Sequence, residues 1–203
     1  MVLVACEESQ IVCKAFRELG HEAFSCDIQD CSGGHPEWHI KDNVLIHLND
    51  GWDLMIGHPP CDFMSKAGAR WMYQNGQLSE ERFEKAMRAR EFFMNLYDAP
   101  IPKIAIENPQ PLNIINLPKF TQSIQPCWFG HPYTKKTLLW LKNLPKLRKT
   151  KYIFEYTPYL PSNTGGKKKG QKYHYTSISK KDASKTFEGI AKAMAEQWSN
   201  SEK

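Results

Sequence analysis

The sequence has no long hydrophobic run and no paired-cysteine motif. No apolar stretch in its 203 residues approaches the roughly 20 residues that a membrane-spanning helix needs. The start of the chain lacks the charged and then apolar layout of a signal peptide. None of the six cysteines forms a C-x-x-C pair, which favours reduced thiols over a disulfide framework. These absences predict a soluble cytoplasmic protein with no membrane partner.

One cysteine–histidine pattern has to be weighed as a zinc site. Cys26, Cys31, His35 and His39 have zinc-ligand chemistry at a C-x4-C-x3-H-x3-H spacing. Zinc sites more often open with a tighter C-x2-C step. We therefore prefer a polar surface loop at these positions and expect no bound metal.

Charge is distributed unevenly along the chain. Residues 135–185 contain 14 Lys or Arg against one Glu and one Asp, so this stretch carries +12 while the whole chain carries +5. Basic side chains neutralise phosphates, and aromatic side chains stack on bases. The combination favours nucleic-acid contact over a merely solvated basic face. The interleaved aromatic residues are Trp140, Tyr152, Phe154, Tyr156, Tyr159, Tyr173 and Tyr175.

Apolar segments of strand and helix type alternate along the chain. Expected strands cover residues 2–5, 22–27, 52–56, 103–106 and 138–141, and expected helices cover 9–19, 79–97 and 184–198. Such alternation predicts an α/β fold with a doubly wound, mostly parallel sheet.

Three parts follow from this pattern. Residues 1–142 are expected to form the core, and 143–182 to form a small irregular basic, aromatic-rich insertion because prolines and glycines interrupt the periodicity there. Residues 183–203 are expected to form a helix that packs back on the core, since an apolar stripe runs along 187–198.

Two expected strands end in reactive side chains. Gly57-His58-Pro59-Pro60-Cys61 follows one strand, and its prolines would hold the thiol of Cys61 at the mouth of the sheet. Glu107 follows three apolar residues, so we expect burial to raise its pKa toward the range useful for proton donation. Each residue alone is more often structural. Together they would place a nucleophile and an acid at one edge of the sheet.

These residues resemble the motifs of a known family. Pro59-Pro60-Cys61-Asp62-Phe63-Met64-Ser65 is similar to the P-P-C-Q-x-x-S catalytic loop of cytosine-C5 DNA methyltransferases, and Glu107-Asn108-Pro109 is similar to their E-N-V motif. Over most of its length the chain resembles small phage-encoded cytosine methylase-like proteins. The resemblance implies a methyltransferase fold of the Rossmann-like type and a location in the cytoplasm of a bacterium or infected host cell.

The resemblance also implies a mechanism. Cys61 would add to C6 of a cytosine extruded from DNA, either duplex or single-stranded, while Glu107 would contact N3 and the exocyclic amine. Carbon 5 would then accept a methyl group from S-adenosylmethionine. An aromatic carbon is a poor nucleophile, and attack at C6 is what makes C5 reactive. The base must first leave the stack.

Cofactor contacts are implied at the ends of the first strands. Asp27 matches the position that usually holds the ribose hydroxyls, and Asp42 resembles the acidic residue near the adenine ring. Cys6, Glu7 and Ser9 in the first loop, with Pro59, would complete the cofactor site. The family usually has a glycine-rich loop at this place, whereas residues 6–10 contain no glycine.

Substrate contacts are implied around the catalytic pair and in the basic region. The Q-x-R-x-R segment of the family corresponds to residues 133–137, so Lys135 and Thr137 stand where arginines are usual. Ser65 and Asn108 would complete the pocket. Lys167, Lys168 and Lys169 would contact phosphates, which position a protein without reading sequence. We therefore expect low sequence specificity.

Two alternative functions stay open. The first is an S-adenosylmethionine-dependent enzyme that modifies a free cytosine nucleotide or an exocyclic amine. The basic region argues against the free nucleotide. His58-Pro59-Pro60-Cys61 argues against the amine, because amino-methyltransferases have an acidic, Asn or Ser residue before the two prolines and an aromatic residue after them. The second is a catalytically inactive, DNA-binding relative. The intact Cys61 and Glu107 argue against it, and the glycine-free loop argues for it.

Overall fold

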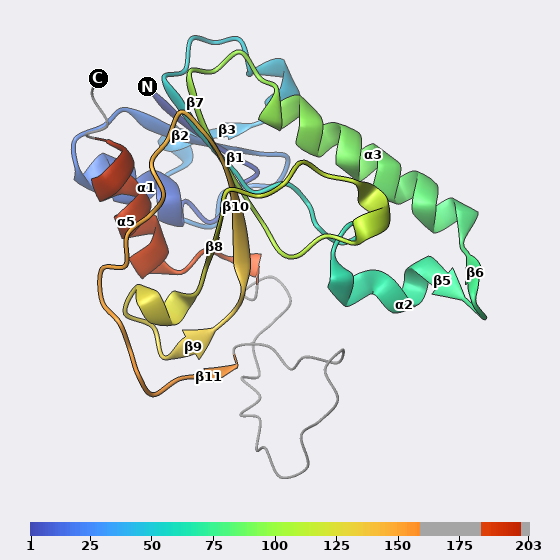
Figure 1. Ribbon diagram of the computed structural model, residues 1–203. Coiled ribbons are helices and arrows are strands. Elements are labelled where there is room, and N and C mark those ends of the chain that lie inside the picture. The colour runs from blue at the N-terminus through green and yellow to red at the C-terminus, as the bar shows by residue number, and fades with distance from the viewer. Residues whose placement is uncertain (159–183, 200–203) are drawn as a thin grey trace.

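A seven-stranded sheet forms the centre of the protein (Figure 1). The computed structural model describes residues 1–158 and 184–199. Within this sheet, β10 (Thr137–Lys142) runs antiparallel to its neighbours β7 (Lys103–Asn108) and β8 (Gln122–Ile124). The other neighbouring strands of the sheet are parallel to each other. In spatial order the strands are β3 (His39–Lys41), β2 (Ala23–Asp27), β1 (Val2–Ala5), β4 (Leu54–Gly57), β7 (Lys103–Asn108), β10 (Thr137–Lys142) and β8 (Gln122–Ile124).

Helices cover both faces of the sheet (Figure 1). α1 (Ile11–Glu18) and α5 (Glu188–Trp198) lie side by side on one face, and α3 (Glu80–Tyr97) covers the other. The short helix α2 (Ala69–Met72) and the hairpin of β5 (Tyr73–Gln74) and β6 (Gln77–Leu78) extend from the α3 side. The predicted fold class, a doubly wound and mostly parallel α/β sheet, is confirmed.

The buried strand β1 shows how the sequence produces two cores. Its side chains alternate between the faces, as the geometry of a strand requires. Val2 and Val4 belong to the core beneath α1 and α5, whereas Leu3 and Ala5 belong to the core beneath α3. Because both faces are covered, the strand is apolar throughout rather than alternating with polar residues.

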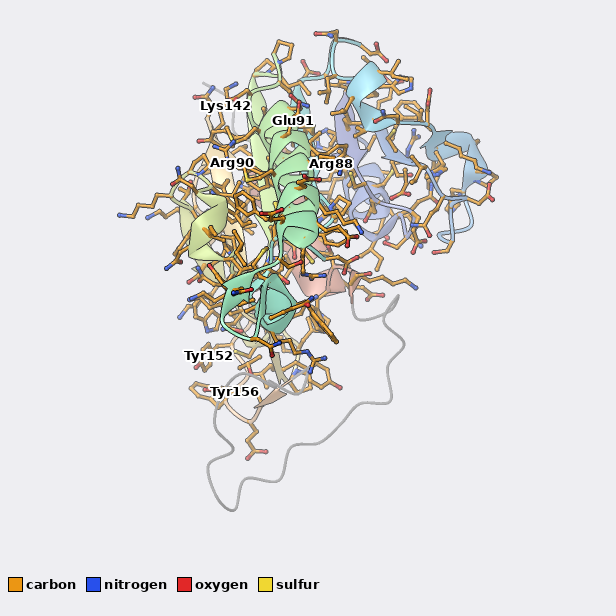
Figure 2. All side chains as sticks on the ribbon, turned by 90° about the vertical axis from the view of Figure 1, so that its right-hand side faces the viewer. Arg88, Arg90, Glu91, Lys142, Tyr152 and Tyr156 are labelled. Atoms are coloured by element: carbon orange, nitrogen blue, oxygen red, sulfur yellow. The ribbon has the colours of Figure 1, made fainter. Side chains whose placement is uncertain are left out.

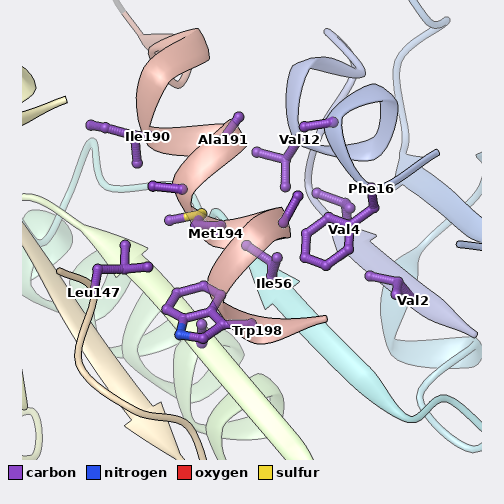
Figure 3. Close-up of a cluster of buried hydrophobic side chains, with 14 of the residues drawn as sticks. Val2, Val4, Val12, Phe16, Ile56, Leu147, Ile190, Ala191, Met194 and Trp198 are labelled. Atoms are coloured by element: carbon purple, nitrogen blue, oxygen red, sulfur yellow. The ribbon is translucent and has the colours of Figure 1, made fainter. Parts of the chain in front are cut away.

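The C-terminal helix is a structural part of the core. Figure 3 shows Ile190, Met194 and Trp198 of α5 beside Ile56 of the sheet, with α1 next to them. Trp198 is almost fully buried, and its indole N–H donates to the carbonyl of Pro145 at 2.9 Å. Burial of a side chain of this size stabilises the fold by about 2–3 kcal/mol. The helix starts at Glu188, four residues later than the sequence pattern indicated.

Several local predictions need correction. Ser79 precedes α3 as expected, but its side chain makes no capping hydrogen bond. The strands β3 and β8, with three residues each, and the β5–β6 hairpin were not predicted. Residues 159–182 of the basic insertion lie outside the described residues. Among the described residues, no helix has the length and apolar character that crossing a bilayer requires.

Candidate active site

Strands β4 and β7 deliver the two predicted reactive residues to one edge of the sheet. Gly57, the last residue of β4, pairs with Ile106, and Glu107 follows within β7. The backbone N–H of His58 still bonds to the carbonyl of Ala5 at the end of β1, at 2.9 Å. The turn to Cys61 therefore begins where three strands end, which is where open α/β sheets bind ligands.

The segments that follow the two strands are tied to each other. The side-chain amide of Asn108 donates to the carbonyl of Pro59 at 3.2 Å. Farther along, backbone hydrogen bonds run from Lys66 to Gln110 at 2.9 Å and from Leu112 to Met64 at 2.8 Å. The sequence-predicted residues Pro59 and Asn108 thus hold the cysteine loop against the loop that follows Glu107.

The cysteine loop is also closed on itself and braced from outside. The carbonyl of Cys61 accepts a backbone hydrogen bond from the buried Ser65 at 2.9 Å. Arg82 of α3 donates to the carbonyl of Asp62 at 3.0 Å and stacks on the ring of Phe63. Cys61 is half-buried within this frame, so its thiol lies at a fixed place that a ligand can reach.

Glu107 has two side-chain partners that the sequence interpretation did not include. The imidazole Nδ1 of His58 lies 3.0 Å from Glu107 Oε2, and the hydroxyl of Thr186 donates to the same oxygen at 3.1 Å. The His58 and Glu107 side chains are only 16% and 15% exposed. The only sequence signal for His58 was a polar residue directly after a buried strand, and Thr186 had none.

The pKa of Glu107 moves opposite to our expectation. Burial raises the pKa of this carboxyl, as the sequence interpretation assumed, but the hydrogen bond and charge of His58 and the charge of Lys135 together outweigh burial. The net pKa lies below its ordinary value. In the free protein Glu107 is therefore a carboxylate and has no proton of its own to donate.

The pKa of His58 is shifted in the complementary direction. Burial lowers the pKa of this imidazole, and Lys135 lowers it further, but the hydrogen bond to Glu107 and the charges of Glu107 and Glu7 raise it above its ordinary value. His58 and Glu107 therefore form an imidazolium–carboxylate pair. No second partner of His58, for its Nε2 atom, occurs among the described residues.

Lys135 supplies a positive charge that acts on the predicted nucleophile. Burial and Asp62 raise the pKa of the Cys61 thiol, while Lys135 lowers it. The ammonium also lies 5.8 Å from the ring centroid of Phe187, just before α5. The charge of Lys135 therefore acts on both Cys61 and Glu107. Thr137 is buried instead, and its hydroxyl donates to the carbonyl of Lys135 at 3.2 Å.

The loop after β1 is built without glycine but with glycine-like backbone. Cys6 and Gln10 have φ angles of 60° and 58°, in the left-handed region that favours glycine. Such strain costs about 1–3 kcal/mol per residue and is concentrated at functional sites. The buried Glu7 accepts hydrogen bonds from the backbone of Val12 at 2.7 Å and Cys13 at 3.1 Å. A side chain of this protein therefore occupies the helix N-terminus that anionic ligands commonly use.

A second loop covers the first. Gln10 is fully buried, and its amide bonds to both the carbonyl and the N–H of His35, at 2.7 and 3.1 Å. A Cβ atom at Gly33 would lie 2.6 Å from the carbonyl of Ser9, so only glycine fits there. Ser9, one of the predicted cofactor contacts, is buried by this close approach. The methionine end of S-adenosylmethionine does not fit here in the usual manner.

The nucleoside end fits better. Asp27 closes β2, is half-buried, and uses one carboxylate oxygen for the backbone N–H of Gln29 at 2.9 Å. Asp42 follows β3 and is exposed, with hydrogen bonds to Asn43 at 2.7 Å and His47 at 3.1 Å. The two carboxylates leave adjacent strands at the same edge of the sheet, as ribose and adenine recognition requires.

Three of the four residues weighed as zinc ligands have other partners. The thiol of Cys26 points to the carbonyl of Asp42 at 3.5 Å, and His39 bonds to Ser25 at 2.8 Å. His35 stacks on Trp38 with ring centroids 3.7 Å apart. Within the described part of the chain, no group of three or more potential ligands could hold a metal ion. Of the predicted site residues, Lys167, Lys168 and Lys169 lie outside that part.

Comparison with known proteins adds a resemblance of fold. No protein-family model and no curated protein sequence matches this chain. One similar structure is described as a DNA modification methyltransferase encoded within an E. coli prophage, with a TM-score of 0.45 and 12% identity over 79% of this chain and 55% of that chain. Another is a mutant DNMT2 of Spodoptera frugiperda, with a TM-score of 0.38 and 15% identity over 81% and 56%. This chain spans little more than half the length of either structure, and its chemistry has to be inferred from its own residues.

Proposed function

We propose that this protein methylates cytosine at carbon 5 in DNA, using Cys61 as the nucleophile and S-adenosylmethionine as the methyl donor. The observation that carries the proposal is the geometry of the β4 and β7 ends. There a half-buried thiol on a braced loop and a mostly buried carboxylate lie at the same edge of the sheet, and the charge of Lys135 acts on both. Asp27 and Asp42 would hold the nucleoside part of the donor, which supplies an electrophilic methyl group when bound.

The residues of the chain divide the work of the reaction. Cys61 loses its proton to solvent, and its thiolate forms a bond to C6 of the cytosine while the electrons of the conjugated ring move toward N3. N3 takes a proton from the Glu107 side, and C5 becomes an enamine carbon that can accept the methyl group. The proton on C5 then leaves to solvent, the C5–C6 double bond forms again as Cys61 departs as thiolate, and N3 returns its proton to Glu107. Lys135 favours the thiolate of Cys61 both before it attacks C6 and when it leaves the product.

Exposed aromatic and basic side chains near the described end of the insertion support DNA as the substrate. Tyr152, Phe154 and Tyr156 are 39%, 83% and 47% exposed. Figure 2 shows Tyr152 and Tyr156 close together at one end of the molecule, away from the arginines of α3. Lys149 lies 5.4 Å from the Tyr152 ring. Stacking of such rings on bases and neutralisation of phosphates would hold a nucleic acid rather than a free nucleotide.

The direct test is analysis of the product. DNA is incubated with the protein and S-adenosylmethionine carrying a labelled methyl group, digested to nucleosides and separated by chromatography with mass detection. We expect label in 5-methylcytosine. Label in an N-methylated cytosine or adenine would show a different reaction. Label that appears only in a control with free deoxycytidine nucleotide would show that the nucleotide, and not DNA, is the substrate.

Replacement of Asp27 tests the cofactor site. Asp27→Ala should weaken S-adenosylmethionine binding by about tenfold or more, because the loss of a hydrogen bond between a charged group and a ligand hydroxyl costs about 1.5–3 kcal/mol. Affinity for DNA should be unchanged. Calorimetric titration measures the affinity for S-adenosylmethionine. The matched control is Asp53→Ala, which replaces an exposed carboxylate directly before the start of β4. Equal cofactor affinity in all three proteins would place the cofactor elsewhere.

Replacement of the lysine triplet tests the phosphate contacts. Changing Lys167, Lys168 and Lys169 together to alanine should weaken DNA binding about equally for all sequences. It should also flatten the slope of log affinity against log salt by up to about 3, since each phosphate contact on duplex DNA contributes about 0.9. Titrations at four salt concentrations measure the slope. An unchanged slope and affinity would assign the triplet no role in holding DNA.

The covered first loop favours a second candidate, a DNA-binding relative without catalysis. The Glu7 carboxylate accepts the backbone N–H groups at the start of α1, and the close contact of Gly33 with the backbone of Ser9 buries Ser9. Calorimetry with S-adenosylmethionine separates the two candidates. Micromolar or tighter binding supports the enzyme, and an absence of binding together with intact DNA affinity supports the binding module.

A further inference from the structure

The lowered pKa of Glu107 creates a chemical difficulty for the proposed reaction. Addition of a thiolate to C6 places negative charge on the ring, and N3 must receive a proton as this happens. Glu107 faces the site as a carboxylate and has no proton to give. Some other group must therefore store one, and it has to lie within hydrogen-bond reach of Glu107.

His58 meets this geometric requirement. Its Nδ1 lies 3.0 Å from Glu107 Oε2, and it is held in place because its own backbone N–H bonds to Ala5 of β1. The Thr186 hydroxyl donates to the same carboxylate oxygen, which fixes the carboxyl plane from the other side. Both of these donors bond to Oε2 rather than to Oε1. An imidazolium beside a carboxylate contains the same number of protons as a neutral imidazole beside a carboxylic acid.

We infer that His58 is a positioning residue that stores the proton which Glu107 passes to N3 of the cytosine. The inference rests on the proposed function. As the sulfur–carbon bond forms, the proton on His58 Nδ1 crosses to Glu107, and the carboxyl donates it to N3. When Cys61 leaves, N3 gives the proton back to Glu107 and His58 recovers its charge. The pair ends as it began, and no oxidant, reductant or further reactant is needed.

The charges around the pair are consistent with this role. From the loop after β1, the buried Glu7 favours the imidazolium, and from the turn before β10, Lys135 opposes it. Lys135 also favours the carboxylate form of Glu107. Cys61 and Asp62 are further titratable groups at the site among the described residues. The proton is thus held between His58 and Glu107 by opposing charges on three loops.

Titration of His58 in the free protein tests the pair without any assay of activity. Nitrogen-15 NMR of the imidazole rings should show His58 titrating above its ordinary pKa in the wild type. In Glu107→Gln the same resonance should titrate below the ordinary value, because burial and Lys135 are then opposed by the charge of Glu7 alone. A wild-type pKa at or below the ordinary value, or no response to Glu107→Gln, would overturn the inference.

The kinetic test compares three variants over pH 6–10. His58→Asn keeps an N–H donor near the Nδ1 position but stores no proton, and it should lower kcat by about 10²-fold, as is typical for general acid–base groups. In the wild type, kcat should fall at alkaline pH as His58 loses the stored proton. This fall should disappear in His58→Asn, because the asparagine does not titrate. Lys135→Arg, whose charge does not titrate in this range, should retain the fall. His21→Asn, a half-buried residue three positions after the end of α1, should match the wild type.

The outcomes separate this inference from the proposed function. A wild type that forms no 5-methylcytosine overturns both. An active wild type whose alkaline fall persists unchanged in His58→Asn overturns the storage of the proton alone, and the rate deficit is then structural. Proton storage by His58 is supported if His58→Asn loses the alkaline fall of kcat and the wild-type imidazole titrates above its ordinary pKa. Thermal unfolding of His58→Asn checks that the variant is folded under the assay conditions.

Discussion

Cys61→Ser should abolish methyl transfer while leaving the fold, the cofactor affinity and the DNA affinity nearly unchanged. Serine is close to cysteine in size, so the braced loop loses little packing. A serine hydroxyl, however, is far less acidic than a thiol and does not form the nucleophile at neutral pH. We expect no labelled product above background over a time in which the wild type completes many turnovers.

The matched control for this experiment is Cys31→Ser. Cys31 is also half-buried and also lies in a loop, but it follows β2 rather than β4. Its variant should methylate at the wild-type rate. A DNA probe containing 5-fluorocytosine adds a second measurement, because the fluorine cannot leave as the C5 proton does and the covalent adduct accumulates. The wild type and Cys31→Ser should form the adduct, and Cys61→Ser should not. Wild-type-like methylation by Cys61→Ser would disprove the covalent mechanism.

The pH dependence of the wild-type rate should reflect a thiol that is difficult to ionise. Burial and the charge of Asp62 raise the pKa of Cys61 above its ordinary value, against the charge of Lys135 and a backbone hydrogen bond, which lower it. The thiolate is therefore a minor species in the free protein at neutral pH. Under the proposed mechanism, the charge of Lys135 would therefore increase the fraction of Cys61 that is present as thiolate.

The sequence predicts the central fold well because the strands that build it are continuously apolar. Val2–Ala5 and Ile104–Ile106 are buried on both faces, and such runs have few other structural solutions. The short strand β3 escapes prediction because His39–Lys41 is partly exposed and has no such run. Its place is determined by pairing with Ser25–Asp27, a contact between segments that no local pattern reveals.

For the candidate site, the sequence indicates the residues but not their electrostatics. Cys61 and Glu107 can be found because each follows an apolar strand. The pKa of Glu107 could not be predicted, because its sign depends on His58 and Lys135, which come from separate loops. Thr186 lies 79 positions away from its partner and reaches it only because α5 packs on the core. The same is true of Gly33, whose requirement for glycine arises from Ser9 and Gln10.

Glu107→Gln should lower the methylation rate by at least about 10²-fold, the usual effect of losing an acid–base group. Glutamine preserves the volume and can still accept hydrogen bonds from His58 and Thr186, so the protein should remain folded. It cannot take up the proton from His58 and donate it to N3. Single-turnover assays with saturating DNA measure the step directly, and S-adenosylmethionine affinity should match the wild type.

The stability of the same variant has a defined dependence on pH. A carboxyl whose pKa is lowered in the folded state adds stability above its ordinary pKa, and this contribution is lost as the pH falls through the folded value. For His58, whose pKa is raised, the contribution is present at low pH and is lost as the pH rises through the folded value. The wild type should therefore exceed Glu107→Gln in stability most clearly between these two pKa values, and the difference should narrow on either side.

Chemical denaturation at several pH values measures this difference, with Glu188→Gln at the exposed start of α5 as the matched control. The control should show neither the rate loss nor the pH-dependent difference. If Glu107→Gln instead unfolds several kcal/mol more easily and methylates at the wild-type rate, Glu107 is a structural carboxylate. In that case the imidazolium–carboxylate pair would serve to fasten β4 to β7, and the acid that protonates N3 would have to be sought on another loop of the same sheet edge.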